Sequence, residues 1–139
     1  LADTIVVLND GRILQKGAPE ELYWRPRSLV AARLLGEVNV LSGTWHDGVL
    51  TTVIGDVKLS GISEGMPRMA LIRPAALTIV PSPDGAWTVL ETEFSAGHQF
   101  VTVQAESGET LRVSGHSTGV TISGETVDVA FDPERVGWA

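Results

Sequence analysis

The sequence has no cysteine, and its only lysines are Lys16 and Lys58. The lack of cysteine excludes disulfides, thiolate metal sites and cysteine nucleophiles. No apolar run approaches the roughly 20 residues that a membrane-spanning helix needs. The first residues, Leu1-Ala2-Asp3, include no initiator methionine and none of the basic and apolar segments of a signal peptide. We therefore expect a cytoplasmic chain that is part of a longer protein.

Negative charge is concentrated in the larger, C-terminal part of the chain. Residues 1–36 carry five basic and four acidic side chains, whereas residues 37–139 carry five basic and thirteen acidic ones. A domain of this charge repels a phosphate backbone and an anionic membrane surface. Nucleic acid is therefore not expected as a partner, and the simplest interpretation of the charge is solubility.

The first 36 residues predict a short α/β segment. The apolar run 5–8, the turn residues Asn9-Asp10-Gly11 and the run 12–16 are typical of an antiparallel hairpin. Pro19 suits the first turn of a short helix. A second helix is predicted over 29–35, with Ser28 as its N-cap and Gly36 at its C-terminal end.

From Val38 onward, short strands alternate with turns rich in glycine and proline, including one turn at Gly55-Asp56. The fold class predicted is mainly β, a small barrel or sandwich over 37–139 preceded by the hairpin and two helices of 1–36. The predicted strands are 38–46, 49–54, 66–73, 77–80, 86–94, 98–105, 109–114 and 125–131.

The sequence offers no set of residues that would catalyse a reaction. A phosphate-binding loop of the form G-x-x-x-x-G-K-[ST] is absent, because neither lysine follows a suitable glycine-rich run. The three histidines, His46, His98 and His116, stand beside turn residues and lack metal-ligand spacing, so they are interpreted as exposed loop residues. Glu91 and Glu93 share one strand face, which we interpret as solvated.

Arg73 is the most suggestive single side chain. Because Pro74 follows it, Arg73 is held in an extended conformation that fixes the direction of its side chain. We expect it either to meet an anion or a partner subunit, or to form a structural ion pair.

The first 23 residues resemble the end of the nucleotide-binding domain of ABC transporters. The run LADTIVVLNDGRI at 1–13 is similar to a family pattern in which "LAD" precedes a strand and an "xDGRI" hairpin. The run 15–23, QKGAPEELY, is similar to "QxGTPEELY". Ala18 stands where the family has threonine, so the side-chain N-cap is missing, at a cost of about 1 kcal/mol.

The rest of the chain resembles the C-terminal extension of importer ATPases. Residues 30–36 and 39–41 are similar to its linker, and LIRPAAL at 71–77 is similar to the "xIRPExL" element of the transport-associated oligonucleotide-fold (TOBE) domain. Residues 127–136 are similar to the closing strand and turn of that domain. Ala75 replaces the usual glutamate, so no contact of that acidic residue is carried over.

This resemblance implies two domains: 1–36, the end of the nucleotide-binding domain with its linker helices, and 37–139, a TOBE-type, oligonucleotide-fold-like regulatory domain. It implies a regulatory and dimerisation role, with Arg73 and His98 as candidate ligand or partner contacts. The parent would use ATP and Mg²⁺ to drive import, whereas this chain alone would bind no cofactor or metal and would not be an enzyme.

The implied partners are a second copy of the chain and the transporter membrane subunits, at the inner face of the cell membrane. The loose likeness of 97–100 to ferric-iron importers favours ferric iron or another small ion as the cargo. The alternatives are a module that senses a small ligand in a polyamine, thiamine or sugar importer, an autonomous enzyme, and a nucleic-acid binder.

Overall fold

The computed structural model describes residues 3–62, 65–114 and 123–139, and the chain divides into two compact units. Unit 1 comprises Leu1–Arg73 and Pro133–Ala139, and unit 2 comprises Pro74–Asp132. Unit 2 is therefore inserted into the sequence of unit 1. Its two ends are adjacent, because Asp132 N donates to Ala76 O at 2.9 Å. The predicted domain boundary after residue 36 rests on family resemblance, not on contacts, and stays a prediction.

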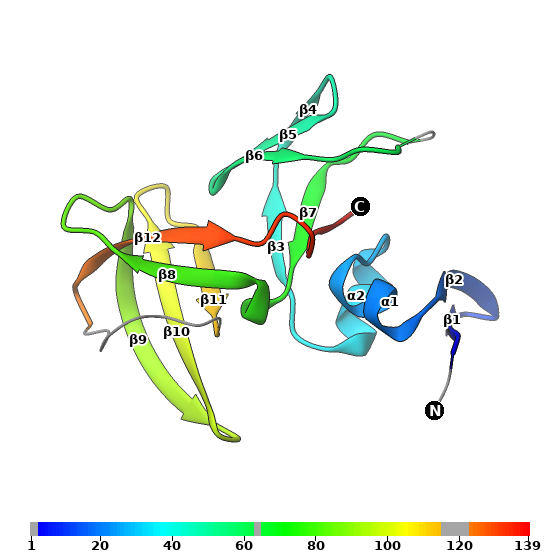
Figure 1. Cartoon of the computed structure of the whole chain (residues 1–139), viewed down its shortest axis with the longest axis horizontal. Coiled ribbons are helices and arrows are strands. Elements are labelled where there is room, and N and C mark those ends of the chain that lie inside the picture. The colour runs from blue at the N-terminus through cyan, green and yellow to red at the C-terminus, as the bar shows by residue number, and fades with distance from the viewer. Residues whose placement is uncertain (1–2, 63–64, 115–122) are drawn as a thin grey trace. The chain divides into compact units, whose positions relative to one another are not determined.

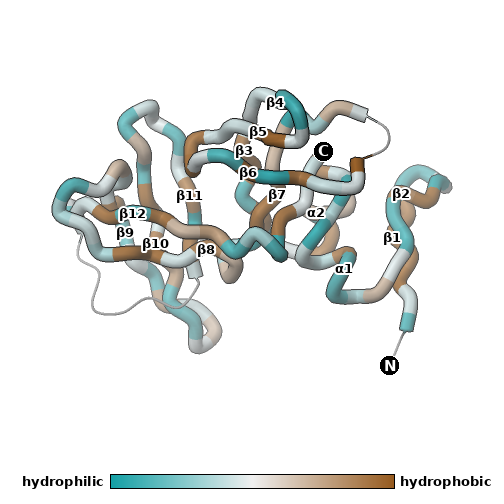
Figure 2. Tube along the Cα trace, turned by 45° about the horizontal axis from the view of Figure 1, so that its top comes forward, coloured by the Kyte–Doolittle hydropathy of each residue, from teal (hydrophilic) through white to brown (hydrophobic). Residues whose placement is uncertain are grey.

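Unit 1 begins with the predicted hairpin, formed by β1 (Ile5–Asn9) and β2 (Arg12–Gly17) (Figure 1). Asp10 and Gly11 both have positive φ, at 51° and 74°, which is the backbone that a two-residue hairpin turn requires. Figure 2 shows apolar residues along the two strands and polar residues at their turn.

Two short helices follow, α1 (Pro19–Trp24) and α2 (Leu29–Leu35), the second as predicted. Ser28 Oγ accepts a hydrogen bond from Ala31 N at 3.3 Å, so the predicted N-cap is confirmed. Ala18 makes no side-chain cap at the start of α1, which is also confirmed. The helices and the hairpin enclose a small apolar core of Val7, Leu22 and Ala31, against which Ile5, Leu14 and Leu35 pack.

Unit 1 also contains two three-stranded antiparallel sheets. The first has the order β13-β7-β3 and the second the order β4-β5-β6. Their strands are β3 (Asn39–Ser42), β4 (Thr44–His46), β5 (Val49–Thr52), β6 (Gly55–Lys58), β7 (Met69–Ile72) and β13 (Gly137–Trp138).

The predictions for this region were wrong at two places. The single strand predicted over 38–46 is divided at Gly43, where the chain lies so close to Leu50 and Thr51 that a Cβ atom would overlap them. The turn predicted at Gly55-Asp56 instead begins β6, which pairs with β5 and buries Val57. The turn itself lies two residues earlier in the chain, at the two residues between Thr52 and Gly55.

Unit 2 is built on one five-stranded antiparallel sheet with the order β11-β10-β9-β12-β8. One face carries the core, which includes Trp87, Val89, Val103 and Leu111. The predicted class, mainly β, is confirmed; within the described residues the sheet is open, with β11 and β8 at its edges. The elements are the 3₁₀ turn η1 (Pro74–Ala76), β8 (Leu77–Pro81), β9 (Trp87–Ser95), β10 (His98–Ala105), β11 (Thr110–Val113) and β12 (Thr126–Phe131).

Candidate functional site

Arg73 is fully buried at the end of β7 and binds the C-terminal ends of both helices. Its Nε donates to Tyr23 O at 2.8 Å, in the last turn of α1. Its Nη1 lies 2.9 Å from Ala32 O, 2.9 Å from Gly36 O and 3.0 Å from Glu37 O, at and beyond the end of α2. Arg73 is therefore a shared cap for two helices.

This arrangement is chemically favourable because the last carbonyls of a helix have no partner inside it and carry partial negative charge. The guanidinium supplies several donors and a positive charge at once. The ring of Tyr23 lies against it, with 4.4 Å between the Arg73 Cζ and the ring centroid. Burial lowers the pKa of Arg73 from its ordinary value. That ordinary value is so high that the side chain stays charged at neutral pH.

One expectation for Arg73 was a structural ion pair. The acceptors that it uses are instead main-chain carbonyls at the ends of the two helices. Its Nη2 is buried without a hydrogen-bond partner among the described residues. The predicted contact with a ligand or partner stays a prediction.

The segment Pro133–Ala139, called here the tail, packs against the link between α1 and α2. Trp138 N donates to Pro26 O at 2.9 Å, and Arg25 Nη1 donates to Glu134 O at 3.0 Å. Arg135 stacks on Trp24, with its Cζ 4.2 Å from the ring centroid. The sequence did not reveal this arrangement, because its partners lie more than 100 residues apart.

His98, the second predicted contact residue, is exposed at the start of β10. It pairs with Ser95 across a two-residue turn in which Ala96 and Gly97 have φ of 51° and 80°. His98 belongs to unit 2 and Arg73 to unit 1. A role of His98 in binding stays a prediction.

A network missed by the sequence analysis lies on the outer face of the sheet in unit 2. Arg112 Nη1 donates to Glu93 Oε2 at 3.1 Å, and its Cζ lies 4.3 Å from the ring centroid of Phe100. Glu91 is exposed on the same face, as expected of a solvated strand. The cross-strand register that joins these side chains could not be read from one sequence.

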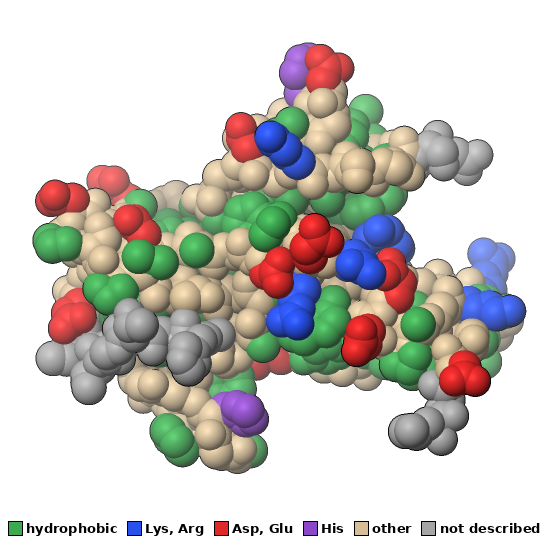
Figure 3. Space-filling model, in the orientation of Figure 1, with side chains coloured by type: hydrophobic (Ala, Val, Ile, Leu, Met, Phe, Trp, Pro, Cys, Tyr) green, Lys and Arg blue, Asp and Glu red, His purple; other side chains and the backbone are tan. Residues whose placement is uncertain are grey.

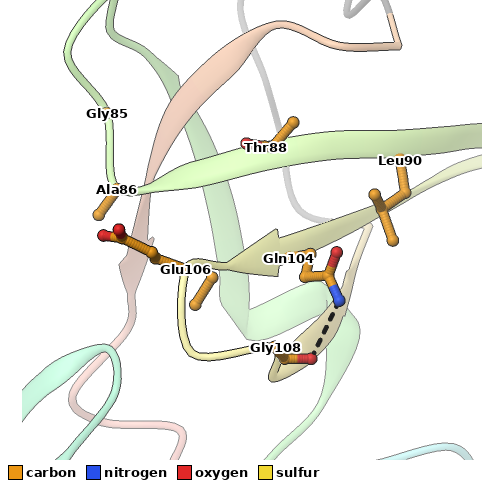
Figure 4. Close-up of a pocket in the computed structure, with 8 residues that line it drawn as sticks. Gly85, Ala86, Thr88, Leu90, Gln104, Glu106 and Gly108 are labelled. Carbon is orange, nitrogen blue, oxygen red and sulfur yellow. Dashed lines mark hydrogen bonds between the residues drawn. The ribbon is translucent and has the colours of Figure 1, made fainter.

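A groove of about 510 Å³ lies at the other end of β9 and β10 (Figure 4). Gln104 Nε2 donates to Gly108 O at 3.1 Å on one side of it, and Glu106 extends toward Ala86 on the other. The exposed side chain of Leu90 supplies apolar surface. The groove contains no charged pair or histidine among the residues that line it, so it offers binding surface rather than catalytic groups.

The other candidate groups remain dispersed. His46 is exposed and lies 3.2 Å from Asp47, while His116 falls outside the described residues. Within the described part of the chain, no three histidine or acidic side chains gather where they could hold a metal ion. No helix in that part is long and apolar enough to cross a membrane.

ATP with Mg²⁺ does not fit the residues present. Lys16 lies at the end of β2 and Lys58 at the end of β6, and neither follows a glycine-rich loop that opens a helix. Among the described residues, neither lysine is therefore part of a backbone cradle of the kind that binds phosphates.

Comparison with known proteins gives relatives along nearly the whole chain. A ferric-ion import ATP-binding protein, FbpC, of Streptomyces coelicolor is 34% identical over 137 residues, which is 98% of this chain and 39% of the relative. The spermidine/putrescine import ATP-binding proteins, PotA, of Borreliella afzelii and Borrelia garinii are each 28% identical over 142 residues, covering 98% of this chain and 40% of the relative. No protein-family model matches the chain.

The chain thus spans about 40% of the length of these relatives and corresponds to a C-terminal portion of them. The predicted resemblance is confirmed: the homologues are ATP-binding subunits of ABC importers.

Proposed function

We propose that this chain, whose homologues are ATP-binding subunits of ABC importers, is the regulatory C-terminal part of such a subunit. The observation that carries the proposal is the similarity along 98% of the chain to proteins more than twice its length. The parent protein would hydrolyse ATP to drive uptake, using nucleotide-binding residues that lie outside this chain.

The β1–β2 hairpin supports an attachment to further protein. One face of it packs on the helices through Val7 and Leu14. The other face leaves Val6, Leu8 and Ile13 exposed by 43%, 59% and 63%. A hairpin that is apolar on both faces is typical of strands covered on both sides, which fits the edge of an ATPase domain.

For the cargo we propose ferric iron or another small ion, because the ferric-ion relative reaches 34% identity. The alternative is a polyamine, as named for the two relatives at 28% identity, or another cargo of this importer group, thiamine or a sugar. One measurement distinguishes the iron and polyamine proposals. Cells that carry the intact importer should take up radioactive iron under the first proposal and radioactive spermidine under the second.

We further propose that the regulatory part joins two copies of the subunit, which work with the membrane subunits at the inner face of the cell membrane. Such a joint keeps the subunits together while the nucleotide sites open, and it gives a regulator two states to bias.

The test of the regulatory role compares the full-length subunit with a version that lacks residues 74–132, both assembled with their membrane subunits in vesicles. Asp132 N bonds to Ala76 O, so the two ends can be joined by a short glycine linker. We expect ATP hydrolysis to persist in the shortened subunit and its control by cargo or regulator to be lost. Unchanged control would refute the role of unit 2.

The test of pairing is the mass of the purified chain by light scattering across a concentration series. A single chain weighs 14.8 kDa, and a paired one would show twice that mass. A monomer at every concentration would contradict autonomous pairing and leave ligand sensing as the proposed role.

A further inference from the structure

Unit 2 holds its own two ends together. It comprises Pro74–Asp132, about 60 residues, and interrupts the sequence of unit 1 between Arg73 and the tail. Because Asp132 N donates to Ala76 O at 2.9 Å, the shortest path between the two ends runs only through residues 74–76 and 132. As long as this bond is made, Arg73 and the tail are joined by a path of four residues.

The last residues of the tail bind unit 1 through main-chain hydrogen bonds. Trp138 N donates to Pro26 O at 2.9 Å, in the link between α1 and α2. Ala139 N donates to Met69 O at 3.1 Å, and Met69 N donates to Ala139 O at the same distance. β13 itself has two residues, a length at which strand pairing is not stable without further support.

The preceding residues of the tail bind α1 at the protein surface. Arg25 Nη1 donates to Glu134 O at 3.0 Å, and the Arg135 Cζ lies 4.2 Å from the centroid of the Trp24 ring. Figure 3 shows basic and acidic side chains close together around α1 on the face in view. Exposed contacts of charged side chains contribute little to stability. The docking of the tail therefore depends strongly on how closely the chain holds it to unit 1.

The size of this dependence follows from loop closure. The probability that the ends of a flexible loop meet falls roughly as the −3/2 power of the loop length. A folded unit 2 closes a loop of four residues, whereas an unfolded one leaves a flexible loop of about 60 residues. The change from the first to the second lowers the equilibrium constant for docking of the tail roughly 50-fold.

We propose that unit 2 acts as a clasp, which holds the tail on the link between α1 and α2 while it is folded and releases the tail when it loosens. A unit of about 60 residues is only marginally stable, so the binding of a ligand to unit 2 can shift this equilibrium. The inference rests on the proposed regulatory function of unit 2 and deepens it. It supplies a route from unit 2 through the tail to the helices, and from them to the β1–β2 hairpin, with which they share a core.

The experiment measures hydrogen exchange, resolved to segments, in three forms of the full-length subunit. The first is the wild type. In the second, a glycine-serine linker of four residues replaces residues 74–132, and in the third the linker has the native length of that segment. The short-linker form is the matched control, because it lacks unit 2 as completely as the long-linker form but keeps the two ends close.

We expect the tail amides to exchange roughly 50-fold faster with the long linker than with the short one. The amides of α1 and α2 should accelerate in the same direction, because they lose the support of the tail. Exchange in β5 and β6 should remain unchanged, and the short-linker form should stay within about threefold of the wild type.

A second variant answers the same question in the intact chain, should either linker form fail to fold. Leu111 is buried in the core of unit 2, so Leu111→Ala should unfold this unit at a lower urea concentration than the rest of the chain. At that concentration the tail should exchange roughly 50-fold faster than in the wild type.

The proposal is overturned if the tail exchanges within about threefold at the two linker lengths, if unfolding of unit 2 in Leu111→Ala leaves the tail protected, or if the helices do not follow the tail. This test reads exchange and not the control of ATP hydrolysis. A failed clasp would therefore leave the regulatory role of unit 2 standing, and a refuted regulatory role would leave the clasp standing.

Discussion

Replacing Arg73 with methionine should destabilise unit 1 by about 3 kcal/mol. Methionine fills a similar volume but has no donors, so the carbonyls of Tyr23, Ala32, Gly36 and Glu37 lose a shared partner. Hydrogen bonds from a charged group contribute roughly 1.5–3 kcal/mol each. The guanidinium directs its Nε–H and two Nη1–H groups at these carbonyls, which at the lower end amounts to about 4.5 kcal/mol.

Part of this contribution is offset in the native protein. The buried Nη2 has no partner among the described residues, and an unmade bond of that kind costs about 1–3 kcal/mol. Methionine removes this penalty together with the favourable bonds. The net loss of about 3 kcal/mol is therefore smaller than the sum of the bonds, yet it is a large share of the 5–15 kcal/mol that stabilises an ordinary domain.

The assay is urea unfolding combined with hydrogen exchange resolved to individual segments. Exchange should accelerate in α1 and α2 and remain unchanged in β8–β12, because every acceptor of Arg73 lies in unit 1. Arg33→Met is the matched control, since Arg33 is an exposed basic residue in the last turn of α2. If Arg73→Met costs less than about 1 kcal/mol, or no more than Arg33→Met, the capping argument is wrong.

Two further predictions concern the same unit. A Cβ atom on Gly137 would overlap backbone atoms of Pro26, so Gly137→Ala should lower the free energy of unfolding by about 3 kcal/mol. The control is Gly17→Ala, whose new Cβ would meet nothing closer than 3.9 Å and which should cost under about 0.5 kcal/mol. Urea unfolding measures both. The hydrogen bond from Arg25, with its charge, lowers the pKa of Glu21. The stability that this pair adds is fully present above the unfolded pKa of about 4.3 and is lost as pH falls through the lower folded pKa. Glu21→Gln should therefore make the melting temperature depend less on pH in that acid range. Because the pair is so exposed, the substitution should cost only about 0.5 kcal/mol at pH 7. An unaltered acid profile would show that the pair contributes nothing.

The sequence was sufficient wherever the determinants of structure are local. The β1–β2 hairpin follows from turn residues between two apolar runs, and α2 lies between Ser28 and Gly36, its two end signals. Gly36 has φ of 148°, a backbone that favours glycine, and the chain turns there so that its carbonyl reaches Arg73. In these places neighbouring residues mark where the element begins and ends.

Long-range contacts could not be predicted in this way. The acceptors of Arg73 lie 36 to 50 residues earlier in the chain, so the sequence showed only that Pro74 restricts it. β13 is two residues long and exists because it pairs with β7. The Arg112–Glu93 pair likewise depends on the register between strands. Each of these features is determined by tertiary packing, which cannot be predicted from neighbouring residues in the sequence.

The helix pair of unit 1 shows how such contacts determine local structure in turn. Helices of six and seven residues are too short to persist in water, because each has too few internal bonds to offset its nucleation. Here Arg73 binds the ends of both, and the tail fastens the link between them at Pro26. Arg73 and the tail are also the two places where the chain leaves unit 1 for unit 2 and returns from it. The helices are therefore stabilised by the same residues that connect the inserted unit, in addition to the apolar core that they share with the hairpin. A change that loosens either connection should destabilise α1 and α2 first.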